Sequence, residues 1–336
     1  MPGKGLADME KNIKEISLRR NNGLSMVDYA IYVVLIGLII VYATLSPSFL
    51  TTRNIFGMLL NGSHLLILSI GMGFVLLTGL IDLSVGSIAY VSVVIAGTLM
   101  RDHGVSPVSG LLICLLVGMG LGLINGILIV KLKLNAILVT LAMMIGLRGV
   151  GHQITKSLII ELDQSLQFVI IHTVGGIPIM VILVIALIII AQIVLSQTIF
   201  GKYVTAIGCN EKAANNLGIN TDFIKIIILL ISGILAAMAG FYSSANLGTC
   251  LQTMGDGWEF QAISIAVLGG VSLSGGVGKI FPGVFIGFLV MVIIENGLAL
   301  LGTTFYLLPI IRGLVIFLAM FADSLRVKRA QKIMSY

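Results

Sequence analysis

The sequence predicts an all-α fold, a polytopic transmembrane helical bundle of about ten spans, with an internal repeat and broken helices. Two observations carry this prediction. The chain is 58% hydrophobic and only 10% charged, whereas about 25% of the residues of a soluble domain are charged. Its apolar residues also gather in stretches long enough to cross a bilayer as helices. The net charge of +6 does not indicate nucleic-acid binding, because the basic residues lie at segment ends and in the tails.

The expected elements run from a polar, basic tail (1–26) through a transmembrane domain (27–323) to a basic tail (324–336). The first apolar run is long enough to span and is expected to remain as an anchor. The second span is expected to be interrupted at 61–64, and the eighth is short for a full crossing. Glycines at every fourth position of 118–126 predict close approach of another helix. The expected spans are approximately 27–46, 55–78, 88–100, 108–130, 135–154, 177–195, 223–244, 260–271, 280–300 and 304–322.

The distribution of basic residues predicts the orientation of this bundle. With the N-terminus inside and ten spans, fifteen basic residues fall on the inner side and three on the outer side. The positive-inside rule therefore places both termini in the cytoplasm. Arg148 and Arg312 lie within spans, where a charge is costly, and we expect them to pair with backbone carbonyls or acids.

The most informative stretch interrupts a long apolar tract at Gly79–Ser87. It holds a carboxylate, Asp82, and a hydroxyl, Ser84, at membrane depth, where a carboxylate costs about 2.5–3.5 kcal/mol on insertion scales. Such a break is expected to face protein or water, because lipid offers no partner to free backbone groups. Two roles stay open for Asp82: a group on a substrate path, or a cap for the span that follows.

An echo of this break predicts an internal duplication. A Gly-x-x-x-Leu-Ser-x-Gly pattern occurs at 79–86 and again at 269–276, and two further short pairs recur in the same order. These matches predict repeats at about 55–150 and 230–315, and repeats with broken helices are typical of transporters. The span count puts both copies of the pattern on one face, and a half-helix in one repeat would invert them. The further pairs are Asn125-Gly126 with Asn296-Gly297, and Leu147-Arg148-Gly149 with Ile311-Arg312-Gly313.

Polar groups in or beside the spans are the candidates for a substrate path. Most such residues form structural hydrogen bonds between helices, and that reading stays open for each of them. Trp258 is the only tryptophan and is either an interfacial residue or a stacking platform for a sugar ring. Glu259 beside it either bonds a hydroxylated solute or lies favourably at a helix N-terminus. The pathway candidates are Asn61, Asp82, Ser84, Trp258, Glu259 and Ser274.

Several other chemistries lack their signatures in this chain. Three scattered cysteines and four histidines without H-x-x-x-H spacing predict no disulfide framework and no metal site. Gly278-Lys279 is not a P-loop, because Leu273 and Ile280 stand where a glycine and a hydroxyl are required. An intramembrane enzyme ranks last, since no acid/base pair or Ser/His constellation recurs near a break.

A polar segment at about 198–222 differs from the spans on either side of it. Its stretch Gly201–Ile219 is amphipathic and lies between glycines. A short helix there, outside the bilayer, could dock on a soluble partner, and a solvated loop is the alternative. The residues expected to take part in docking are Gly201, Tyr203, Gly208, Asn210, Glu211, Ala214 and Gly218.

Three stretches together resemble the permease subunits of ribose-type monosaccharide ABC importers, in the branched-chain amino acid/ribose permease superfamily. Gly79–Ser87 is similar to that family's Gly-Ile-Asp-Leu-Ser-Val-Gly-Ser, with Leu80 as the difference. Gly201–Ile219 is similar to its cytoplasmic loop, on which the ATPase docks, and Ala266–Gly278 is similar to its glycine-rich Val-Leu-Gly-Gly-x-Ser block. The resemblance runs from about Leu45 to Asp323.

The resemblance implies a noncatalytic permease in the bacterial inner membrane, surrounded by lipid and paired with a second copy or a close homologue. It implies an ABC ATPase subunit that carries ATP-Mg, and a periplasmic or lipoprotein solute-binding protein that delivers a small sugar. The chain itself is expected to bind no cofactor and no nucleic acid. An ion-coupled secondary carrier, with Asp82 as the coupling carboxylate, is the alternative, and it is weakened by the scarcity of buried carboxylates.

Overall fold

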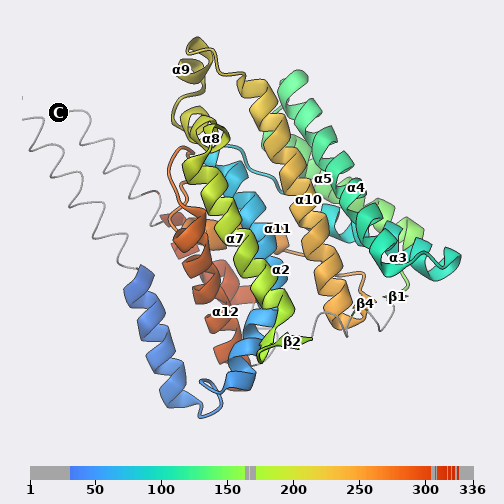
Figure 1. Cartoon of the computed structure of the whole chain (residues 1–336), viewed down its shortest axis with the longest axis vertical. Helices are drawn as coiled ribbons and strands as arrows, with labels where there is room; N and C mark the ends of the chain where they lie inside the picture. Colours follow the sequence, from blue (N-terminus) through green and yellow to red (C-terminus); the bar gives the residue numbers. More distant parts are fainter. Residues whose placement is uncertain are drawn as a thin grey trace, which may run out of the picture.

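A computed structural model of the protein describes residues 31–162, 166, 172–303, 307, 309–315, 317–318, 320–321 and 324. Long helices make up most of this part of the chain, and the strands form only two sheets of two short strands each (Figure 1). The all-α prediction is therefore confirmed. The expected N-terminal tail and nearly all of the expected C-terminal tail lie outside the described residues.

Seven helical segments of the described part are long and apolar enough to cross a membrane. Three further apolar helices of the described part are shorter: the one at Ile31–Leu45, α8 (Ile199–Cys209) and α11 (Trp258–Leu268). The expected count of ten spans is not confirmed, because the last expected span is described only in part. The seven are α2 (Thr52–Leu77), α3 (Val85–His103), α4 with η1 (Pro107–Gly126 and Ile127–Lys131), α5 (Ala136–Thr155), α7 (Ile179–Gln197), α10 (Thr221–Leu247), and η2 with α12 (Ile280–Val284 and Phe285–Leu300).

The expected interruption of the second span is wrong, because α2 runs unbroken through Asn61–His64. The hydroxyl of Ser63 donates to the carbonyl of Leu59 at 2.7 Å, so this polar side chain is satisfied within its own helix. Gly62 lets Phe288 and Val292 of α12 approach closely, since a Cβ at Gly62 would lie 3.0 and 2.8 Å from their side chains. Polar and small residues here therefore serve helix packing and do not break the helix.

The close approach predicted for the fourth span is confirmed by the contact between α4 and α10. Gly118 and Gly122 of α4 face Gly233 of α10, and a Cβ at Gly118 or Gly233 would collide with a carbonyl of the other helix. Small residues of this kind let two helix backbones approach and gain dispersion contacts along their length. This contact joins the first half of the chain to the second.

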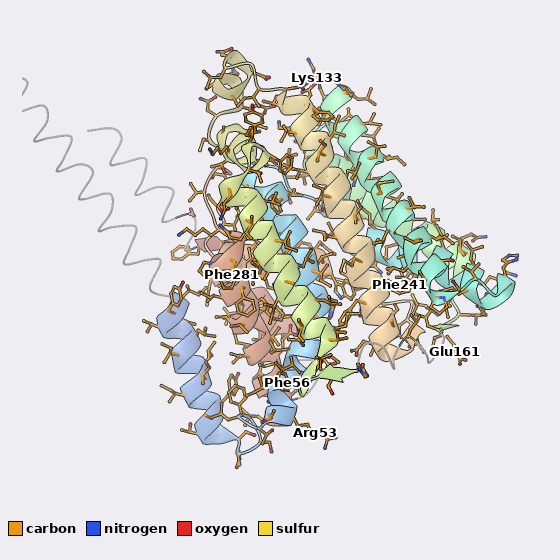
Figure 2. The ribbon with its side chains drawn as sticks, in the orientation of Figure 1. Arg53, Phe56, Lys133, Glu161, Phe241 and Phe281 are labelled. Carbon is orange, nitrogen blue, oxygen red and sulfur yellow. The ribbon has the colours of Figure 1, made fainter. Side chains whose placement is uncertain are left out.

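The bundle has two distinct ends (Figure 1). The short helices α8 (Ile199–Cys209) and α9 (Glu211–Asn216) lie at one end, called here the coupling end. The strands lie at the other, the sheet end, where β1 (Ile160–Glu161) pairs with β4 (Thr249–Cys250), and β2 (Thr173–Val174) with β3 (Ile177–Pro178). Figure 2 shows Lys133 at the coupling end and Arg53 and Glu161 at the sheet end.

Two irregular segments interrupt the helices inside this bundle. The first break, Thr78–Ser84, separates α2 from α3 and agrees with the break expected from the sequence. The second break, Gly269–Lys279, separates α11 from η2 and contains the echo of the first pattern. At about 1.5 Å per residue, the 11 residues of α11 cover about 16 Å, so this helix crosses only part of a bilayer.

Candidate functional site

A buried polar network surrounds the first break. Oδ1 of Asp82 accepts hydrogen bonds from the backbone N–H of Ser84 at 2.9 Å and from its hydroxyl at 2.6 Å. Oδ2 of Asp82 accepts from the hydroxyl of Ser232 on α10 at 3.3 Å, and the amide of Asn125 on α4 donates to the Ser84 hydroxyl at 2.8 Å. All four side chains are buried. The network therefore ties the break to two other helices.

This network bears on both roles that the sequence left open for Asp82. The carboxylate bonds the N–H of Ser84, the residue directly before α3, while the Ser84 hydroxyl makes no capping bond to the helix. Asp82 and Ser84 are each 0% exposed, so the polar side chains of the break face protein, as expected at membrane depth. A place for these two side chains on a substrate path stays a prediction.

A second cluster forms where α11 begins. The rings of His64 on α2 and Trp258 have centroids 4.5 Å apart, and Asn61 lies one helical turn from His64. Oδ1 of Asn61 accepts from the side-chain amide of Asn246 at 3.2 Å. Glu259 is 4% exposed, and its Oε2 is buried without a hydrogen-bond partner. Three of the predicted pathway residues, Asn61, Trp258 and Glu259, are thus brought to one region.

The start of α3 reaches this second cluster. A Cβ at Gly86 would lie 2.7 Å from Oε2 of Glu259 and would collide with the carbonyl of Gly255. Gly86 follows Ser84 by half a helical turn, so the first turn of α3 separates the network of Asp82 from the carboxylate of Glu259. Backbone N–H groups of a helix's first turn favour a nearby negative charge. Glu259 therefore lies near the first turns of two helices, α3 and its own α11.

Ser274, the last of the predicted pathway residues, lies apart from the cluster around Glu259. Its side chain is exposed, and its backbone N–H donates to the hydroxyl of Ser272 at 3.2 Å. Its carbonyl oxygen would lie 3.6 Å from a Cβ at Gly79. Ser274 therefore joins the second break to the beginning of the first.

The predicted docking segment folds into two capped helices. The Thr198 hydroxyl accepts from the N–H of Gly201 at 3.2 Å and begins α8, and the Asn210 side chain accepts from the N–H of Ala213 at 3.0 Å and begins α9. Side-chain oxygens at these positions satisfy N–H groups that a helix start leaves free. The prediction of a short helix is confirmed in its structure, while its partner is not present to test docking.

The predicted docking residues divide into a buried and an exposed group. Ala214 is 2% exposed, and Gly201 is buried where a Cβ would collide with the backbone of Leu195. Gly218 has a φ of +82°, which suits glycine. Tyr203, Asn210 and Glu211 are exposed, and Glu211 forms an ion pair with Lys225 of α10 at 2.5 Å. The exposed side chains are the ones that a docking partner could contact.

The C-terminal end of α8 lies against the end of α2 and against the second break. A Cβ at Gly208 would collide with the carbonyl of Leu77 and with the backbone N–H of Gly276. That N–H donates to the Leu77 carbonyl at 2.9 Å, and the Cys209 thiol donates to the Gly276 carbonyl at 3.7 Å. The end of α2, the second break and α8 therefore meet through backbone atoms at the coupling end.

Gln192 of α7 is a contact that sequence reasoning missed. Its Oε1 accepts from the backbone N–H groups of Ile280 at 2.9 Å and Phe281 at 3.0 Å, where the second break leads into η2. A single polar residue in an otherwise apolar span was the only sequence signal. Since α7 leads directly into α8, this bond connects the helix before the docking segment to the second break.

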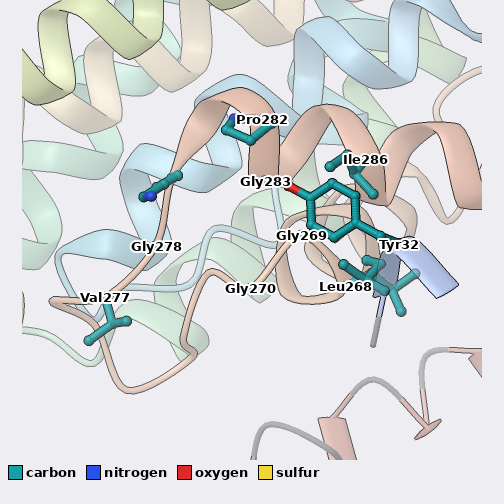
Figure 3. A pocket seen from close by; sticks show the side chains of 11 residues that line it. Tyr32, Leu268, Gly269, Gly270, Val277, Gly278, Pro282, Gly283 and Ile286 are labelled. Atoms are coloured by element: carbon teal, nitrogen blue, oxygen red, sulfur yellow. The ribbon is translucent and has the colours of Figure 1, made fainter. Parts of the chain in front are cut away.

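A pocket of about 220 Å³ borders the second break (Figure 3). Its lining includes Tyr32, Leu268, Val277, Lys279 and several backbone positions of glycine. Neither Asp82 nor Glu259 lines it. In the part of the chain that the structure describes, no group of three or more His, Cys, Asp or Glu side chains is arranged to hold a metal ion.

Broken helices with buried polar groups, in a bundle of apolar spans, are typical of membrane transport proteins. The family model for the permease component of the branched-chain amino acid transport system matches residues 54–322. The chain belongs to this family, and it is a multi-pass membrane protein.

Named relatives resemble the chain over most of its length. It is 36% identical over 297 residues to the ribose import permease protein RbsC of Escherichia coli K12, covering 87% of this chain and 92% of the relative. It is 37% identical to RbsC of Bacillus subtilis 168, covering 85% and 89%. It is 35% identical to the L-arabinose ABC transporter permease protein AraH of Azospirillum brasilense, covering 88% of each chain. No solved structure matches it.

Proposed function

We propose that the chain is the noncatalytic permease subunit of an ATP-binding-cassette importer and forms the translocation pathway for ribose or a related monosaccharide. The names of its relatives, which cover ribose and arabinose permeases, support this substrate class. The observation that carries the mechanism is the packing of α8 against Leu77 and Gly276, because it places a docking helix in direct contact with the second break and with the end of α2, where the first break begins.

The proposed mechanism uses this contact to couple two sites. A separate ATPase subunit, which carries ATP-Mg, docks on the exposed side of α8 and α9 and moves them when it closes. Because Gly208 touches the end of α2 and Gly276 of the second break, that movement shifts the second break relative to α2 and changes access to the polar interior. The chain itself binds no cofactor in this scheme.

The proposed orientation follows from the docking helices. The coupling end faces the cytoplasm, where the ATPase is, and the sheet end faces outward, where a solute-binding protein delivers the sugar. Two copies of the chain, or one copy and a close homologue, form the assembled permease within the lipid bilayer. The contribution of each proposed pathway residue to transport can be tested by substitution. These residues are Asn61, Asp82, Ser84, Trp258, Glu259 and Ser274.

The docking assignment is tested by crosslinking. A cysteine placed at Asn215, an exposed residue of α9, in a Cys209→Ser background is expected to capture the ATPase subunit in the assembled complex. A cysteine placed at Gly104, the residue directly after α3, is the matched control and should not capture the ATPase subunit. Failure of the Asn215 position to crosslink in an active complex would contradict the docking assignment.

Transport itself is tested with the complex reconstituted in proteoliposomes. Radiolabelled ribose is expected to accumulate only when ATP and the binding protein are supplied, and competition by other pentoses and hexoses would define the sugar. Uptake driven by an ion gradient in the absence of ATP would instead support a secondary carrier.

A further inference from the structure

Arg148 of α5 makes contacts that no role in the proposed pathway explains. Its Nη1 donates to the backbone carbonyl of Met254 at 2.6 Å, and its Nη2 pairs with Oδ1 of Asp256 at 2.8 Å. The guanidinium carbon lies 5.5 Å from the ring centroid of Tyr90 on α3. The side chain is only 17% exposed. A charge within an apolar span needs such partners, and here they come from α3 and from the segment before α11.

That segment, residues 249–257, forms a strap across the sheet end. At its beginning, β4 pairs with β1, and the side-chain amide of Gln252 donates to the carbonyl of Ser157. In its middle, Gly255 touches the first turn of α3 so closely that a Cβ would collide with the carbonyl of Gly86. The strap is therefore fastened to α3 and to the α5 side by backbone pairing, by close packing and by Arg148.

Glu259 lies directly beyond the strap. Its carboxylate is buried, and Oε2 has neither a hydrogen-bond partner nor contact with solvent. The same carboxylate faces Gly86, which the strap covers through Gly255. An unsatisfied buried acceptor is costly to maintain, so it is a group for which a partner is expected in another state. Moving the strap away from α3 would open a route from the sheet end to Glu259.

The repeat counterpart of Arg148 fastens the same half-helix from its other side. Nε of Arg312 pairs with Oε1 of Glu295 on α12 at 2.7 Å. With the amide of Gln261 turned so that its oxygen faces the guanidinium, Gln261 accepts from Nη1 of Arg312 at 2.8 Å. Thus Arg312 holds the body of α11, while Arg148 holds the strap that leads into it.

The partner of each arginine differs in exposure. The side chain of Asp256 is 57% exposed, whereas that of Glu295 is 23% exposed. An ion pair with a solvent-exposed partner is weaker and more easily exchanged for water than a shielded one. Of the two attachments, the strap is therefore the one that is easier to release.

We propose that Arg148 is a positioning residue, a latch that keeps the strap closed over Glu259, and that release of its pairing with Asp256 opens the sheet end to the incoming solute. The inference rests on the proposed transport function, because opening the sheet end matters only if the chain conducts a solute. It assigns Arg148 and Asp256 to control of access and leaves binding of the solute to other side chains.

Native Cys250 provides a test, because it lies in the strap and is 2% exposed. In the assembled complex, with Cys114→Ala and Cys209→Ser, the labelling rate of Cys250 by a membrane-impermeant thiosulfonate reagent reports opening of the strap. Arg148→Gln is expected to raise this rate at least tenfold, Asp256→Asn several-fold, and Arg148→Lys by an intermediate factor. Arg101→Gln is the matched control, since Arg101 pairs with Asp102 at the exposed end of α3, and its rate should stay within twofold of the parent.

A second readout separates a latch from a merely structural contact. In the parent complex, ATP and the binding protein are expected to accelerate Cys250 labelling, and Arg148→Gln should make the rate high and independent of both. Labelling of Arg148→Gln at the parent rate would overturn the proposal. If Arg148→Gln does not fold, Asp256→Asn decides, since an unchanged rate in that variant overturns it equally. Labelling requires no transport. A wild-type complex that imports no sugar would therefore refute the proposed function, while the labelling rates of Cys250 would still show whether Arg148 keeps the strap closed.

Discussion

Replacing Asp82 by alanine tests what the buried carboxylate contributes. The change removes the acceptor of three hydrogen bonds, two from Ser84 and one from Ser232. At about 1 kcal/mol net for each of the two local bonds and about 0.6 kcal/mol for the bond to another helix, the loss is about 3 kcal/mol. At about 2–4 °C per kcal/mol for a large chain, the melting temperature of the purified permease should fall by roughly 6–12 °C.

Asp82→Asn and Ser232→Ala provide the graded controls. Asparagine keeps a carbonyl oxygen for the N–H of Ser84, and the two hydroxyls can rotate, so its cost is expected to stay below about 1 kcal/mol. Ser232→Ala removes only the bond between the break and α10, worth about 0.6 kcal/mol. Melting is followed by size-exclusion chromatography after heating, and sugar uptake is measured with the same preparations.

The outcomes distinguish the two roles of Asp82. If the carboxylate is structural, melting temperature and uptake fall together in the order Asp82→Ala, Asp82→Asn, Ser232→Ala. Uptake abolished by Asp82→Asn at an unchanged melting temperature would refute this reasoning and place the side chain on the solute path. An Asp82→Ala permease as stable as the parent would also refute it, because the three hydrogen bonds would then contribute nothing.

Three further predictions concern contacts between segments. Gly118→Ala is expected to lower stability by about 1–3 kcal/mol in a melting assay, because its Cβ would meet α10, whereas Gly120→Ala, with open space around it inside α4, should not lower stability. Gly208→Ala is expected to abolish ATP-driven uptake while leaving basal ATP hydrolysis, since its Cβ would separate α8 from Leu77; unchanged uptake would contradict this contact. Gln192→Leu should lower stability by about 1–3 kcal/mol for the N–H of Ile280 left unsatisfied, and equal melting temperatures would disprove it.

The sequence predicted what depends on local composition and spacing. Apolar run length located the long helices, and the glycine ladder from Gly118 predicted the contact with another helix, because both signals act along one segment. The first break was also predicted within a few residues, since a carboxylate among glycines has no stable place in an apolar helix. These features needed no knowledge of which segments become neighbours.

The interruption expected in the second span shows where such local reasoning fails. Polar residues and a glycine in succession at Asn61–His64 predict a break in the helix. In the structure, Ser63 bonds its own helix, and Gly62 receives side chains of α12, more than 200 positions away. The deciding partner was a distant helix, which a reading along the chain cannot supply.

The candidate site was predictable in its members but not in its grouping. Trp258 and Glu259 were named from the sequence, yet nothing local indicated that Glu259 would face Gly86 across the start of α3. Gln192 was missed because one amide in a long apolar helix carries no motif. Arg148 was expected to pair with carbonyls or acids, which the structure confirms, but its particular partners follow from how the strap folds back on α3.

The position of α11 links the two ends of the molecule. Its N-terminus begins at the strap that Arg148 holds, and its C-terminus leads into the second break, which touches Gly208 of α8. In the proposed mechanism, a displacement of the second break by α8 would be passed to the strap through α11 alone, a helix of about 16 Å. Energetic coupling between distant sites requires such an element with two arrangements. Under the proposed function, α11 is the element through which α8 at the coupling end would control access at the sheet end, and Arg148 pairs with Asp256 just before its start while Arg312 contacts Gln261 within it.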